Sequence, residues 1–193
     1  TLAPLLIEKF SRRHPHVHVC LDIQSDDERI EWMVLENQGF GIAVSTGRNR
    51  NIEKHELLGT EAVCLLPVSH RLAGNEVISP EDLVGENFIS YFEGSIFKND
   101  IDKAFNTAKV RRFTRYEGKT TGAIIGMVGA GLGVSIIDSG FGAGSFDPRC
   151  ITIPFKPAIP YTAELLWSTQ RDLSAIQNEF LNMVREEFGD LNI

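Results

Sequence analysis

The sequence predicts an α/β fold built from two lobes. Segments with strand character alternate with segments of helical periodicity, and no internal repeat or low-complexity tract interrupts them. Such alternation is typical of a mostly parallel sheet. Two apolar, proline-containing segments, 65–73 and 155–163, indicate crossings between lobes. They place residues 1–67 and 160–193 in lobe I and residues 68–159 in lobe II.

The first part of the chain predicts helix, strand, helix and strand in that order. Apolar residues at helical spacing form a first helix, with Pro4 in its first turn and its end before Pro15. Alternation over 17–23 predicts a strand. A second amphipathic helix follows within 24–39, and 40–45 is a short apolar strand.

The rest of the chain continues this alternation. Ser79 begins a helical turn, because it precedes Pro80 and two acidic residues. Periodicity then predicts strands at 61–68, 87–90, 111–117, 134–137, 150–155 and 161–168, and helices at 94–108, around 120–128 and at 174–188.

The glycines at 129, 131 and 133 resemble a nucleotide-binding loop at first sight. A dinucleotide loop needs a strand, then G-x-G-x-x-G, then a helix. Here the helical residues come before the glycines, the strand follows them, and Val134 occupies the place of the third glycine. Gly131 is therefore interpreted as a helix stop, and Gly133 as the space needed for the turn into the strand.

The charge of the chain argues against nucleic-acid binding by this segment. Its 26 acidic and 19 basic residues give a net charge of −7, whereas phosphate contacts need a basic surface. The paired arginines Arg12–Arg13 and Arg111–Arg112 are interpreted as solvated helix ends or strand edges.

Cysteine usage and hydropathy predict a cytoplasmic protein. Cys20, Cys64 and Cys150 are odd in number, widely spaced and without a C-x-x-C pair, as expected in a reducing compartment. The first two lie in apolar runs and are interpreted as buried thiols. No apolar run approaches the roughly 18 residues of a membrane helix, and the chain opens without Met or a charged leader. It therefore reads as part of a longer protein.

Five segments, in order, resemble the effector-binding domain of LysR-type transcriptional regulators. They are LAPLLIEKFSRRHPHVHVCLDI, GFGIAVS, LLPVSHRLA, DLVGENFIS and VGAGLGVSIID. Three positions depart from the family pattern: Gly41 replaces an aspartate, Arg71 a proline, and Ile137-Asp138 a leucine-proline pair.

The resemblance implies a fold of two Rossmann-like lobes like that of type 2 periplasmic binding proteins, with a small-molecule cleft between the lobes. It implies a sensor without catalytic residues, metal or cofactor, and a winged helix-turn-helix domain N-terminal to this chain that contacts DNA. It also implies a homodimer or tetramer without a membrane partner, in which 2–10 pairs with 96–104 of a second copy. Both helices also need their apolar faces for their own core, so that alternative stays open.

The ligand residues are predicted from loops that open helices. Thr120 and Thr121 offer hydroxyls and helix N–H groups to a carboxylate, and Gly94 and Ser95 offer the same from a second helix start. The remaining candidate ligand-binding residues are Thr1, Ser25, Asp26, Glu93, Lys119 and Asp138.

Most of these residues also have a simpler structural interpretation. Asp26 can favour the dipole of its own helix, and Glu93, Lys98 and Lys119 can be ordinary surface charges. Asp26, with Glu93 nearby in the opposing lobe, would suit an ammonium or guanidinium group better than a second carboxylate. The predicted effector is therefore a small carboxylate, in a finer form an amino acid or its conjugate. Resemblance also points to lysine-pathway or opine-type compounds.

The sequence lacks the residue patterns of a metal site and of a hydrolase. His16 and His18 share a strand face without the carboxylate or thiol spacing of a metal site. Ser69 and His70 are neighbours in a predicted strand, so their side chains point to opposite faces, and no G-x-S-x-G elbow supports a hydrolase. The alternative function is a solute-binding protein or an enzyme on the same two-lobed fold.

Overall fold

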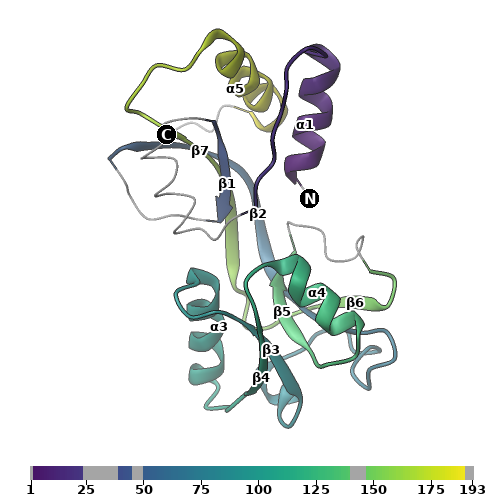
Figure 1. The fold of residues 1–193 in the computed structure, drawn as a ribbon. Coiled ribbons are helices and arrows are strands. Elements are labelled where there is room, and N and C mark those ends of the chain that lie inside the picture. The colour runs from purple at the N-terminus through teal and green to yellow at the C-terminus, as the bar shows by residue number, and fades with distance from the viewer. Residues whose placement is uncertain (1, 24–38, 45–49, 140–146, 190–193) are drawn as a thin grey trace. The chain divides into compact units, whose positions relative to one another are not determined.

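The computed structural model describes residues 2–23, 39–44, 50–139 and 147–189 (Figure 1). The chain divides into two compact units: Thr1–Gly59 with Thr162–Ile193 form unit 1, and Thr60–Tyr161 form unit 2. Both divisions fall inside strands, the first in β2 (Ile52–Pro67) and the second in β7 (Pro160–Ser168). The limits of lobes I and II stay a prediction.

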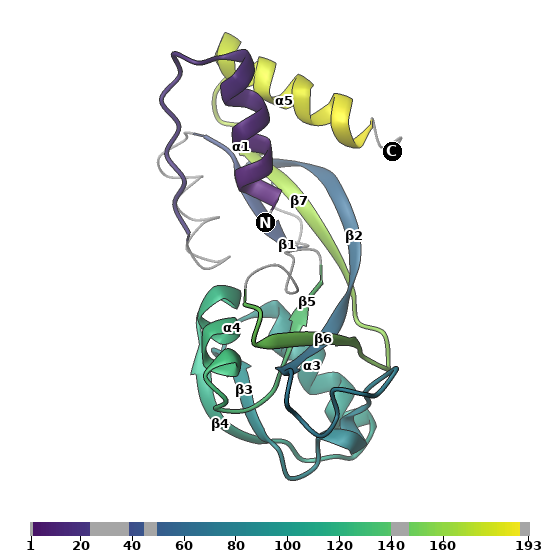
Figure 2. The same cartoon turned by 90° about the vertical axis from the view of Figure 1, so that its right-hand side faces the viewer.

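The described part of unit 1 contains two helices and a pair of antiparallel strands. Strand β1 (Gly41–Val44) pairs antiparallel with β7, which carries the buried Leu165 and Leu166. Helices α1 (Leu2–Arg13) and α5 (Ala175–Phe188) lie side by side in Figures 1 and 2.

Aromatic and charged contacts join the two helices of unit 1. The rings of Phe10 and Phe180 meet edge to face, with centroids 5.2 Å apart. Arg13 donates to Glu186 at 3.1 Å, and Lys9 pairs with Glu187. The predicted first and last helices are thus confirmed, and α1 ends before Pro15 as expected.

The strand predicted over 17–23 is not formed. These residues belong to no strand, and Cys20, expected to be buried, is exposed. Alternation predicts an extended chain, but a strand also needs a hydrogen-bonded neighbour, which a local pattern does not specify. The helix expected within 24–39 lies outside the described residues except for Gly39.

Unit 2 contains two sheets. The second half of β2 pairs antiparallel with β5 (Ser135–Asp138) and β6 (Cys150–Pro154). Strands β3 (Asn87–Tyr91) and β4 (Phe113–Gly118) form a parallel pair. Three of the ladders among the described residues, β1–β7, β2–β5 and β2–β6, are antiparallel, so the expectation of a mostly parallel sheet is wrong. Parallel pairing joins β3 to β4 and also occurs at two isolated bridges, Phe88–Val134 and Ile78–Phe155.

The described residues of unit 2 also form three helical elements: the 3₁₀ turn η1 (Pro80–Leu83), α3 (Ile96–Thr107) and α4 (Thr121–Gly129). Helices α3 and α4 flank the β3–β4 pair in Figure 1. The core between these elements is aliphatic and aromatic, and burial raises the pKa of the Cys64 thiol within it. Its most deeply buried side chains include Leu65, Phe88, Ile89, Ile101, Ile124 and Ile136.

The glycines after α4 have the structural roles predicted for them. Gly131 has a φ of +77°, which ends the helix in the left-handed region. A Cβ on Gly133 would lie 2.2 Å from the carbonyl oxygen of Asn87, because the chain passes directly beside β3. This stretch therefore carries no dinucleotide-type phosphate loop.

Candidate functional site

The carboxyl ends of β3 and β4 lie next to each other, since Tyr91 is the register partner of Gly118. Helix α3 begins five residues after Tyr91, and α4 begins three residues after Gly118. In open α/β sheets, ligands bind outside the carboxyl ends of parallel strands. This edge of unit 2 is the candidate site.

The start of α4 presents neutral polar groups. Thr120 is the N-cap, and its hydroxyl accepts a hydrogen bond from the Ala123 N–H at 3.2 Å. The Thr121 hydroxyl shares a hydrogen bond of 3.0 Å with the buried Tyr91 hydroxyl. Hydroxyls and the N–H groups of a first helical turn suit the oxygens of an anion.

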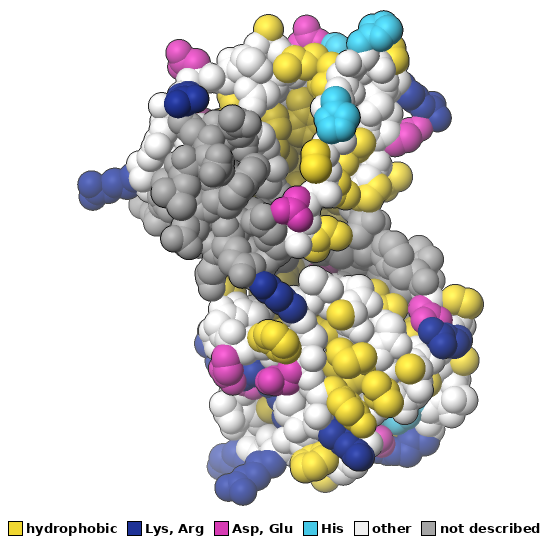
Figure 3. Space-filling view, in the orientation of Figure 1, with side chains coloured by type: hydrophobic (Ala, Val, Ile, Leu, Met, Phe, Trp, Pro, Cys, Tyr) yellow, Lys and Arg dark blue, Asp and Glu magenta, His cyan; other side chains and the backbone are white. Residues whose placement is uncertain are grey.

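No charged side chain belongs to α4 itself. Its nine residues are Thr121 followed by glycine and apolar residues, and Figure 3 shows hydrophobic side chains over this part of unit 2. Within α4 the groups that attract an anion are hydroxyls, N–H groups and the helix dipole, and Lys119 directly precedes the Thr120 cap.

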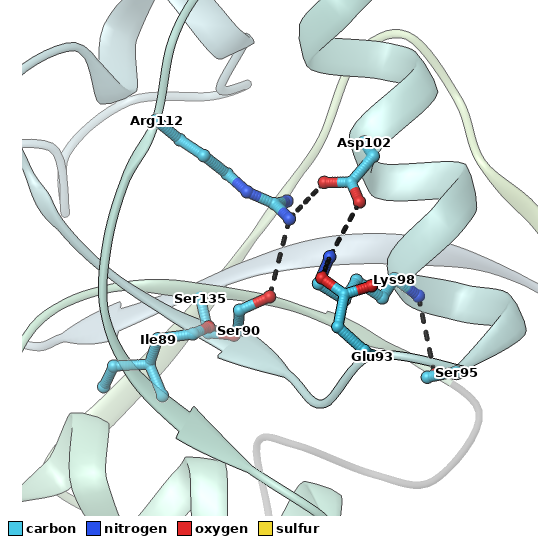
Figure 4. Close-up of polar contacts among 8 residues, drawn as sticks. All are labelled: Ile89, Ser90, Glu93, Ser95, Lys98, Asp102, Arg112 and Ser135. Atoms are coloured by element: carbon cyan, nitrogen blue, oxygen red, sulfur yellow. Dashed lines mark hydrogen bonds and ion pairs between the residues drawn. The ribbon is translucent and has the colours of Figure 1, made fainter.

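The start of α3 is charged instead. Gly94, with a φ of +91°, turns the chain, and Ser95 caps the helix by accepting from the Lys98 N–H at 3.5 Å. The Lys98 ammonium donates to Glu93 at 2.6 Å and to Asp102 at 3.0 Å (Figure 4).

Arg112, directly before β4, extends these contacts. Its guanidinium pairs with Asp102 and lies 3.5 Å from the Ser90 hydroxyl. It also lies over the rings of Phe88 and Phe105, at 4.7 and 5.4 Å from their centroids. Its side chain is only 8% exposed. Arg112 therefore is not the solvated strand-edge residue that the sequence indicated.

Burial and hydrogen bonding act in opposite directions on the two cations. The pKa of Lys98 is raised, chiefly by its hydrogen bond to Glu93. The pKa of Arg112 is lowered, chiefly by burial, while Asp102 opposes that effect. Arginine stays charged in proteins, and a raised lysine pKa keeps Lys98 protonated at neutral pH.

The described part of the chain places the predicted ligand residues in three groups. Glu93, Gly94, Ser95, Lys119, Thr120 and Thr121 all belong to the two connections at the β3–β4 edge. Asp138 is buried at the end of β5, opposite Ala62 of β2. Thr1, Ser25 and Asp26 lie outside the described residues.

Sequence reasoning missed three residues that support this edge. Tyr91 lay one residue beyond the predicted strand 87–90, Asp102 was part of a helix pattern, and Arg112 was part of a basic pair. The one local signal was the i, i+4 spacing of Lys98 and Asp102, which brings opposite charges together on a helix.

The other chemistry-bearing residues of unit 2 have structural partners. His70 Nε2 lies 3.2 Å from Glu86, and its Nδ1 accepts from the Leu72 N–H at 3.3 Å, so the ring is held within its turn. Among the described residues, no cluster of three His, Cys, Asp or Glu side chains could hold a metal ion. None of the described helices is both long and apolar enough to cross a membrane.

Comparison with known proteins identifies the class. The LysR substrate binding domain model matches residues 1–189, so the chain belongs to that family. The chain is 28% identical over 177 residues to the transcriptional activator protein LysR of Escherichia coli K12, covering 92% of this chain and 57% of that protein. It thus spans a little under three fifths of this relative's length.

Solved structures agree on the fold. The regulatory domain of CcmR from Synechocystis PCC6803, in complex with 2-PG, has a TM-score of 0.83 at 19% identity, covering 98% of this chain and 92% of that one. The effector binding domain of QuiR, in complex with shikimate, has a TM-score of 0.81 at 16% identity, covering 99% and 92%. The fold is that of the LysR effector-binding domains, which resemble type 2 periplasmic binding proteins.

The family settles the choice between sensor and enzyme. This chain is the effector-binding domain of a LysR-type regulator, a regulatory ligand-binding module that does not catalyse a reaction. Its site must therefore be judged by what it can bind, and by how binding changes the groups around it.

Proposed function

We propose that the chain senses a small carboxylate and that the carboxylate is bound at the start of α4. The observation that carries this proposal is the group of hydroxyls there: Thr120 caps the helix, and Thr121 shares a hydrogen bond with Tyr91 beside it. These groups lie at the carboxyl ends of parallel strands, where the helix dipole favours a negative charge.

The ligands of the structural neighbours support an acidic effector. The QuiR domain is in complex with shikimate, a carboxylate, and the CcmR domain with 2-PG. An amino acid or its conjugate is the finer form of the proposal. Glu93, which contacts Lys98 through one carboxylate oxygen, and Asp26 are the acidic groups offered to its ammonium.

The effector would act on transcription through a separate DNA-binding domain. The net charge of −7 disfavours direct contact between this chain and phosphates, so in this proposal an N-terminal domain of the whole cytoplasmic protein contacts DNA. Self-association through α1 and α3 is part of the same proposal. Sedimentation of the chain alone tests self-association: we expect oligomers, and a strict monomer contradicts this part of the proposal. Sedimentation with duplex DNA tests DNA contact: we expect no complex, and salt-sensitive DNA binding contradicts that part.

Calorimetric titration tests the effector. The panel contains shikimate, simple dicarboxylates, amino acids and opines. For the tightest compound, Thr121→Val should weaken binding about tenfold or more, because a hydrogen bond to a charged group contributes about 1.5–3 kcal/mol. Thr114→Val, at an exposed position of β4, is the matched control and should leave affinity unchanged. Equal affinities for the Thr121 and Thr114 variants would refute a carboxylate site at α4.

A further inference from the structure

Two buried cations in unit 2 share a single acidic side chain. Lys98 and Arg112 have side chains 11% and 8% exposed, and both contact Asp102 (Figure 4). The charges of these three groups, +1, +1 and −1, sum to +1. A buried excess charge is costly unless another group balances it.

Glu93 provides that balance from the surface. Its carboxylate contacts Lys98 at 2.6 Å, yet its side chain is 82% exposed. The two acidic partners of Lys98 therefore differ in kind: Asp102 is fixed on α3 and also bound to Arg112, whereas Glu93 lies in the loop before α3, next to Gly94. Because the Glu93 carboxylate stays in solvent, it can leave Lys98 without unfolding its surroundings, and another anion can take its place.

We propose that the Lys98 ammonium is an anion-binding position that Glu93 fills from within the chain. A carboxylate or phosphate oxygen of a small molecule takes the place of Glu93, which then turns to solvent. Lys98 is held for this exchange by Asp102, and Arg112 keeps Asp102 in place while lying against Phe88 and Phe105.

The anion position at Lys98 extends the proposed function, and its role in effector choice rests on that function. The loop that carries Glu93 follows Tyr91, whose hydroxyl is bonded to Thr121 at the start of α4. An effector bound at Thr121 would bring a second acidic group toward Lys98, so the domain would favour compounds with two acidic groups over monocarboxylates. The exchange at Lys98 itself is measurable with simple anions.

Removing the internal competitor is the direct test. Acetate and inorganic phosphate are titrated separately at constant ionic strength, and the backbone amides of residues 93–98 are followed by NMR. Glu93→Gln should bind at least one of these anions about fivefold more tightly than the unmodified chain, since an exposed ion pair no longer competes. Glu76→Gln, at an exposed loop position, is the matched control and should leave the affinity unchanged. Unchanged affinity for both anions in Glu93→Gln overturns the proposal.

Two further variants locate the anion. In Glu93→Gln/Lys98→Gln the gain in anion affinity should be lost. If melting shows that this variant does not fold, Glu93→Gln/Lys98→Arg replaces it. That variant keeps the cation and should retain the gain in affinity, and loss of the gain counts against the proposal. Glu93→Gln/Thr121→Val should also retain the gain. If Thr121→Val removes it, the anion binds at α4, so the exchange at Lys98 is refuted while the proposed function stands. A gain that persists while no carboxylate of the effector panel binds refutes the proposed function alone.

Discussion

The starts of α3 and α4 occupy equivalent places in unit 2 but are built from different chemistry. Each helix follows the carboxyl end of one strand of the parallel pair, and each is capped by a hydroxyl, Ser95 in α3 and Thr120 in α4. Around Ser95 the neighbours are charged and partly buried. Around Thr120 they are hydroxyls and small or apolar residues, with Lys119 as its charged neighbour in the chain.

This difference shows how one edge can recognise two features of a ligand. At α4 the hydroxyl and N–H donors of the helix start are neutral, and the helix dipole favours an anion there. At α3 the Lys98 cation already holds two carboxylates, and in the proposed exchange an anion takes the place of one of them, Glu93. The start of α4 therefore favours affinity for carboxylates in general, and the start of α3 favours discrimination between anions.

The largest effect on stability is expected from Asp102, which pairs with both cations near the start of α3. Asp102→Asn leaves Lys98 and Arg112 without their common carboxylate and should lower the free energy of unfolding by about 3 kcal/mol. Asp100→Asn removes only the exposed pair with Lys103 and should cost at most about 0.5 kcal/mol. Urea unfolding measures both. Similar losses would mean that the buried network does not stabilise α3.

The stability of the start of α4 depends on close packing against β4. A Cβ on Gly118, the last residue of β4, would lie 2.8 Å from a side-chain carbon of the fully buried Ile124. Gly118→Ala should therefore lower the free energy of unfolding by about 1–3 kcal/mol. Gly126→Ala meets nothing within 4 Å in the same helix and should raise it by about 0.5–1 kcal/mol. Thermal or urea unfolding gives both signs, and two changes of the same sign would contradict this account.

Local patterns predicted much of this edge. The helix expected over 94–108 is Ile96–Thr107, and the caps Ser95 and Thr120 were identified because a hydroxyl before a helical pattern has a local cause. Gly131 and Gly133 were interpreted correctly for the same reason: a helix stop and a tight turn depend on a few neighbouring residues.

Contacts between distant segments could not be read in this way. The burial of Arg112 depends on Phe88 and Phe105 meeting beside it, and nothing in the basic pair at 111–112 indicates those rings. The residues 17–23 alternate like a strand but form none in the described chain, because strand formation needs a partner elsewhere in the sequence. Tyr91 likewise joins the site only through the register of β3 with β4.

The smallest effect should separate the two caps themselves. The Thr120 hydroxyl accepts from Ala123 at 3.2 Å, whereas the Ser95 hydroxyl is 3.5 Å from the Lys98 nitrogen, at the limit of a hydrogen bond. Thr120→Ala should therefore lower the free energy of unfolding by about 1 kcal/mol and Ser95→Ala by about 0.5 kcal/mol. Urea unfolding of both variants, with Thr120→Ser and Ser95→Thr as cap-retaining controls, measures the difference. A larger loss for Ser95→Ala would show that the hydroxyl cap, and not the charged network, is what holds the start of α3.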